Sequence, residues 1–236
     1  MIDVGQIPVW FRGHDSFIDA VSVFVLLLIA FFSIKYYKIK KNRNYLLLSV
    51  AFVLLSVSFL FKILTAISAY VGFENGRQIS YAGLDWNSLG SPQSIMFIIY
   101  FIYHLIVFFG LYVMYSVYQK QSDSNILLIS YLIVVSAFFS NQYETMFHLT
   151  YLIMLALITS QTLLSYVRKK YQATRLIVYS FLIITFSQLL FVLVELNAIF
   201  YIIAQFAQLI GYLTLLIAFI AVLIYGRKEN EDRYNW

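Results

Sequence analysis

Residues 45–71, YLLLSVAFVLLSVSFLFKILTAISAYV, form an apolar run interrupted by a single charged side chain, Lys62. An α-helix rises 1.5 Å per residue, so about 20 apolar residues cross a hydrocarbon core of roughly 30 Å. The whole chain shares this character, because 62% of its residues are hydrophobic and only 11% are charged. The sequence therefore predicts an all-α integral membrane protein.

Six further apolar stretches lie on both sides of this run, separated by short polar connections. We expect a bundle of seven transmembrane helices at residues 17–37, 45–71, 94–118, 126–140, 145–167, 176–194 and 199–225. The fourth stretch has only about 15 residues, fewer than a perpendicular crossing requires. The last two are counted separately because about 50 residues of helix would measure roughly 75 Å, and Glu195 and Asn197 mark the reversal between them.

The basic residues predict the orientation of these helices, because Lys and Arg are enriched in cytoplasmic loops. An outer N terminus places 13 of the 16 basic residues on the inner side: Lys35, Lys38, Lys40, Lys41, Arg43, Lys120, Arg168, Lys169, Lys170, Arg175, Arg227, Lys228 and Arg233. We therefore predict a multi-pass protein of the cell membrane with its N terminus outside and its C terminus in the cytoplasm. Membrane insertion and anionic lipids account for the net charge of +5, so we expect no nucleic-acid partner.

The predicted domain organisation is simple, because no polar segment is long enough to fold alone. We expect an outer segment at 1–16, one membrane domain at 17–225 and an inner tail at 226–236. The longest outer connection, 72–93, is punctuated by Gly, Asn, Ser and Pro and is predicted to form a lid. The absence of a cationic run before the first apolar stretch argues against a cleavable signal peptide. Zero cysteines exclude disulfides and thiol chemistry.

Lys62 is the most unusual candidate for a functional site, because ionisable groups within membrane spans are expensive and face the bundle interior or water. It lies about 17 residues, or roughly 25 Å, from the inner start of its helix, and hence in the outer third. One interpretation is that the ammonium snorkels to the outer interface. The other is an ion pair with Asp19, Glu144 or Glu195, which the predicted topology places near outer helix ends.

Two histidines within spans are further candidates. His104 lies roughly 15 Å deep, near the bilayer midplane, with Tyr100 one turn earlier on the same face. Glu144 and His148 begin the 145–167 helix and its polar stripe one turn apart. A metal site would need more than these two ligands, and the estimated depth of His104 differs from theirs, so hydrogen bonding to a neighbouring helix is the favoured role. We expect no bound metal, cofactor or catalytic residue.

The last two predicted helices each carry a polar stripe that we expect to face the interior. One stripe contains Thr185, Gln188 and Glu195, and the other contains Tyr201, Gln205, Gln208 and Tyr212. Interhelical hydrogen bonds are one explanation of both stripes. The other is an outward-opening pocket under the lid, since convergent polar groups in an apolar cleft are typical of binding sites.

In architecture the chain resembles the seven-helix sensor regions, with an outer N terminus, that precede histidine kinases in many prokaryotes. The resemblance covers residues 17–225 and depends on span number, orientation and the basic loop KYYKIKKNR that leads into YLLLSVAFVLLSVSFLFK. The kinase itself is absent from the sequence, so such a sensor would signal through a separate protein at the basic inner face.

We therefore expect a receptor-like or accessory plasma-membrane module that binds a small amphipathic ligand or another membrane subunit. One alternative is a membrane enzyme or redox subunit that uses His104 and the Glu144/His148 pair. A second alternative is a transporter of small solutes. Non-enzymatic binding is the favoured class.

Overall fold

The computed structural model describes residues 11, 14–74, 92–118, 123–140, 143–169 and 172–234. Most of the predicted lid and of the outer segment lie outside these ranges. The described helices are α1 (His14–Lys40), α2 (Arg43–Glu74), α3 (Pro92–Ser116), α4 (Asp123–Ser140), α5 (Glu144–Lys169), α6 (Gln172–Val192), the short 3₁₀ turn η3 (Leu193–Glu195) and α7 (Ile199–Tyr234).

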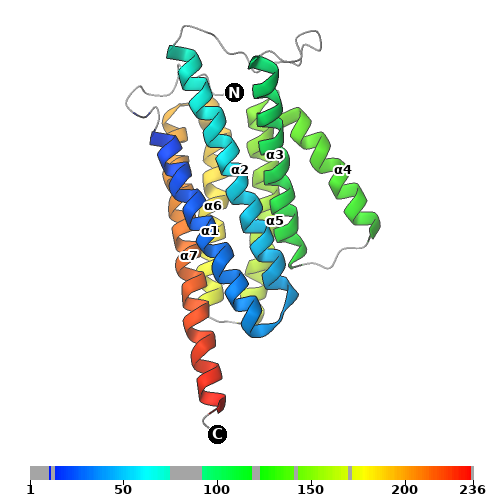
Figure 1. The fold of residues 1–236 in the computed structure, drawn as a ribbon, viewed down its shortest axis with the longest axis vertical. Coiled ribbons are helices and arrows are strands. Elements are labelled where there is room, and N and C mark those ends of the chain that lie inside the picture. The colour runs from blue at the N-terminus through cyan, green and yellow to red at the C-terminus, as the bar shows by residue number, and fades with distance from the viewer. Residues whose placement is uncertain are drawn as a thin grey trace.

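Six of these helices are long and apolar enough to cross a membrane, and α4 contains a shorter apolar segment, Ile129–Ser140. The molecule is thus an all-helical, multi-pass type of membrane protein. Consecutive helices run in opposite directions, so α1, α3, α5 and α7 begin where α2, α4 and α6 end (Figure 1). We call this the α1 end of the bundle. The last residues of α7 lie at the opposite end, where the predicted inner tail continues this helix to Tyr234.

Local sequence explains the tight turns between neighbouring helices. Lys41 adopts a left-handed φ of 53° and donates its backbone N–H to the carbonyl of Tyr37, 2.8 Å away. The Asn42 side chain then accepts the backbone N–H of Asn44 at 3.0 Å, which satisfies a free donor at the start of α2. Asn197 does the same for Ile199 at 2.9 Å, so the predicted reversal near this residue is where α7 begins.

The helices pack through small and aromatic residues. Ser49 on α2 donates to the carbonyl of Ala30 on α1 at 3.0 Å, and Gly211 lets α7 approach α6 so closely that an added Cβ would lie 2.5 Å from Ile184 Cγ1. Phe52 packs edge-on against Phe219 between α2 and α7, with ring centroids 5.7 Å apart. Large apolar side chains on the outward faces remain exposed, which suits a fold whose solvent is lipid.

The fourth helix differs from the other six. It packs mainly against α3 and α5, and it leans away from the bundle along its length (Figure 1). Its end at Ser140 lies at the α1 end, close to the start of α5. The bundle therefore consists of six long helices, with a shorter helix attached at one side.

Candidate functional site

Lys62 pairs with Asp19, one of its three predicted partners. The Lys62 Nζ atom lies 3.0 Å from each carboxylate oxygen of Asp19 and 5.5 Å from the centre of the Phe59 ring. The Asp19 side chain is 3% exposed and that of Lys62 is 21% exposed. Lys62 thus joins α2 to α1 through a largely buried ion pair, whereas snorkelling would direct the ammonium to the interface.

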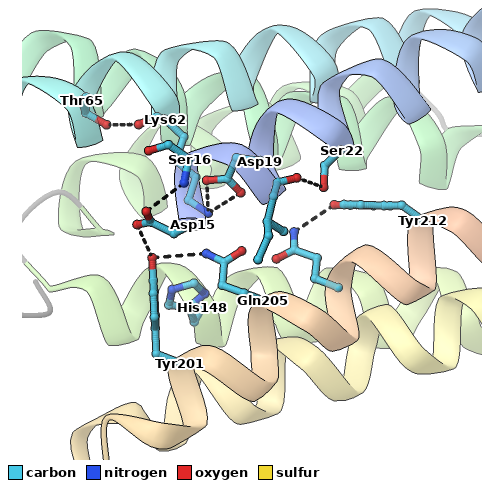
Figure 2. A network of polar contacts seen from close by, with 12 residues as sticks. Asp15, Ser16, Asp19, Ser22, Lys62, Thr65, His148, Tyr201, Gln205 and Tyr212 are labelled. Carbon is cyan, nitrogen blue, oxygen red and sulfur yellow. Dashed lines mark hydrogen bonds and ion pairs between the residues drawn. The ribbon is translucent and has the colours of Figure 1, made fainter. Parts of the chain in front are cut away.

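A second polar contact joins α1 to α7. The Tyr201 hydroxyl donates to Asp15 Oδ2 at 3.1 Å and accepts from the Gln205 amide at 3.2 Å, and Asp15 also accepts the backbone N–H of Ser16 at 2.8 Å. All three side chains that meet here are buried. Figure 2 shows Asp15 and Asp19 side by side on α1, with Lys62 of α2 above them and Tyr201 and Gln205 of α7 below. Asp15 is not among the predicted site residues, although its position one turn before Asp19 places both carboxylates on one face of α1.

His148 connects α5 to α6. Its Nδ1 atom lies 2.9 Å from the amide oxygen of Gln188, so the imidazole N–H donates there, and its Nε2 atom lies 3.9 Å from a carboxylate oxygen of Glu144. The imidazole also stacks on Phe191 of α6, with centroids 4.5 Å apart and planes 10° from parallel. Packing and hydrogen bonding together hold this histidine in place.

The remaining predicted polar residues also connect helices. The Tyr151 hydroxyl lies 3.3 Å from that of Tyr212, which accepts from the Gln208 amide at 3.1 Å, so α5 and α7 are joined. Thr145 donates to Glu195 in η3. Glu195 itself is exposed, so the prediction that it faces the interior is wrong. The helical periodicity used for that prediction ends at Val192, before the 3₁₀ turn begins.

His104 occupies a different environment, an aromatic box formed by Tyr100, Tyr103 and Phe147. Their ring centroids lie 4.4, 5.0 and 4.3 Å from the centre of the imidazole. The side chain is fully buried, at 0% exposure, yet neither ring nitrogen has a hydrogen-bond partner among the described residues. Buried polar groups are almost always hydrogen-bonded, and an unsatisfied one costs about 1–3 kcal/mol.

The predicted difference in depth between His104 and the Glu144/His148 pair is wrong. Phe147 contacts His104 and also His148, with centroids 4.3 and 5.1 Å apart, respectively. The two histidines are therefore near one level. The prediction takes the first residue of each helix as the membrane surface, but α3 begins at Pro92, farther from His104 than the start of α5 at Glu144 is from His148. Within the described ranges, however, no group of three or more His, Asp or Glu side chains is arranged to hold a metal ion.

The polar contacts gather at the α1 end of the bundle and come from five helices. They join α1 to α2, α1 to α7, α5 to α6, and α5 to α7. We call these contacts the polar network. Comparison of the chain with protein-family models, with curated proteins and with solved structures finds no match.

Proposed function

We propose that the chain crosses the membrane seven times, with the α1 end of the bundle outside and the end of α7 in the cytoplasm. The alternating direction of the helices and the gathering of basic residues at the opposite end support this arrangement. The test is protease accessibility of an N-terminal and a C-terminal tag in sealed inside-out and right-side-out vesicles. Opposite accessibility of the two tags is expected, and tags on the same side would overturn the proposal.

Within this topology, we infer a receptor-like function, in which the module binds a small amphipathic molecule at the α1 end. The observation that carries this inference is the polar network, in which buried polar side chains from five helices converge at one end of an apolar bundle. Polar groups inside a membrane are expensive, and their convergence in apolar surroundings is the usual mark of a binding site. The signal would pass to a separate protein at the basic inner face.

The test is to purify the protein in mild detergent, extract it with organic solvent and identify retained molecules by mass spectrometry. We expect one amphipathic molecule at near-stoichiometric amount. A stoichiometric haem or metal would favour the enzyme alternative, and a tightly retained membrane protein would favour an accessory subunit, so either result would overturn the receptor-like function. Failure to retain any molecule would overturn it as well.

A pair of tyrosine variants adds a matched control to this test. Tyr201→Phe removes the hydroxyl that bridges Asp15 and Gln205, so we expect less of the molecule to be retained. Tyr179→Phe removes the hydroxyl of an exposed tyrosine that bonds Arg175 on the same helix, and retention should stay unchanged. Equal retention in both variants would contradict a role for the polar network in binding.

A further inference from the structure

The unused hydrogen-bonding capacity of His104 indicates more than a packing role. Other polar residues predicted for the site are also buried, but they have side-chain hydrogen-bond partners at 2.9–3.2 Å; among them are Asp19, His148, Gln188 and Gln205. His104 is more deeply buried than His148, and it has no such partner among the described residues. A neutral imidazole carries one N–H donor and one acceptor nitrogen, so two favourable interactions are available here.

Another buried polar group without a hydrogen-bond partner in the described ranges, the hydroxyl of Ser140, lies on the neighbouring helix α4. Ser140, the last residue of α4, is 1% exposed, and its Oγ atom also has no hydrogen-bond partner in the described part of the chain. The fourth helix packs mainly against α3 and α5, which carry His104 and Phe147. It is also the helix that leans away from the bundle (Figure 1).

We propose that His104 binds the hydroxyl group of a phenol-like molecule that enters between α3, α4 and α5. A hydroxyl both donates and accepts, so it satisfies the imidazole in either tautomer. We expect an uncharged head group, because three aromatic rings pack around the fully buried imidazole and a desolvated charge would be costly there. An aromatic body suits these neighbours through edge-on and offset ring contacts.

This inference rests on the proposed receptor-like function and names the class of its ligand. It also separates two roles within the bundle. The polar network would hold the helices that form the site, whereas His104 would contact the ligand itself. Because α4 is the shortest helix and leans outward, its displacement is the route by which the molecule reaches α3 and α5.

The experiment uses 4-propylphenol and propylbenzene, which differ only in the hydroxyl group. The chain has three histidines, so protein labelled with ¹⁵N-histidine in lipid nanodiscs gives few imidazole signals, and the His104→Phe variant assigns one of them. We expect 4-propylphenol to shift the His104 signals in a saturable way, while propylbenzene does not shift them. The signal of His14, which is exposed, serves as the internal control.

Binding constants from the same titrations complete the test. Wild-type protein should bind 4-propylphenol about tenfold more tightly than propylbenzene, as expected for one net hydrogen bond, and His104→Phe should remove this preference. His14→Phe is the matched control and should keep the preference, because His14 is exposed. Equal shifts with both probes, or an unchanged preference in His104→Phe, would overturn the assignment of His104.

The failure of this inference is distinguishable from the failure of the proposed function. If purified protein retains an amphipathic molecule but 4-propylphenol leaves the His104 signals unchanged, the ligand class is wrong and the receptor-like function stands. If the protein retains no molecule and binds neither probe, both proposals fail.

Discussion

His148 and His104 both pack against Phe147, but their hydrogen bonding differs. His148 bonds Gln188 and stacks on Phe191, whereas His104 is enclosed by aromatic rings and has no hydrogen-bond partner among the described residues. Neighbouring positions in one bundle thus place the same side chain in two different environments. Burial alone does not distinguish these two histidines, whereas the number of hydrogen-bonded ring nitrogens does.

The largest expected loss of stability comes from breaking the Lys62–Asp19 ion pair, which belongs to the same polar network as His148. Lys62→Met would leave the Asp19 carboxylate buried without its ammonium partner. We expect the free energy of unfolding to fall by about 3 kcal/mol, the lower end for breaking a buried pair, because Lys62 is 21% exposed. Thermal unfolding in detergent measures this change. Lys35→Met, at an exposed site, is the control, and equal melting temperatures of the two variants would contradict a stabilising ion pair.

The second largest loss of stability is expected where α6 and α7 pack closely at Gly211. Gly211→Ala would place a Cβ 2.5 Å from Ile184 Cγ1 and force α6 and α7 apart, at a cost of about 2–3 kcal/mol. Gly110→Ala on α3 meets its nearest side-chain atoms at 3.3 Å, so a smaller loss is expected. Because Ile184→Ala removes the atom that the new Cβ would meet, the double variant should lose less stability than the sum of the two single variants. A larger loss of stability in Gly110→Ala than in Gly211→Ala would show that the α6–α7 contact is not tighter than the α2–α3 contact.

The histidine pair itself provides the direct test of the comparison. His148→Phe would leave the amide oxygen of Gln188 without its donor, and we expect a loss of about 1–3 kcal/mol in unfolding free energy. Gln188→Leu should destabilise the protein by a similar amount, and the double variant should cost less than the sum of both. Strictly additive losses would show that the two side chains do not interact.

The smallest expected effect is that of His104→Phe without added ligand. Replacing an unsatisfied buried imidazole by an apolar ring of similar shape should change the unfolding free energy by less than about 1 kcal/mol, or raise it. Thermal unfolding beside His148→Phe gives the comparison on one scale. A loss equal to that of His148→Phe would show that His104 is satisfied in the folded protein.

Hydropathy and helical spacing sufficed to predict most of the helices and the reversal near Asn197. They left Lys62 with three possible partners, because depth along a helix does not show which neighbour lies beside it. The contact between Asp15 and Tyr201 joins residues 186 positions apart, and no local pattern signals it. The position of Glu195 was mispredicted because a 3₁₀ turn interrupts the helical period, and that of His104 because the helices begin at different levels.

The length of α4 has a further consequence for the surrounding lipid. Its 18 residues extend about 27 Å along the helix axis, and its tilt shortens the thickness of hydrocarbon that they can match. Hydrophobic mismatch in a thick bilayer would therefore concentrate at this helix, which would respond by changing its tilt or by thinning the adjacent leaflets. The acyl-chain length of the host membrane would thus act directly on the helix that packs against α3 and α5.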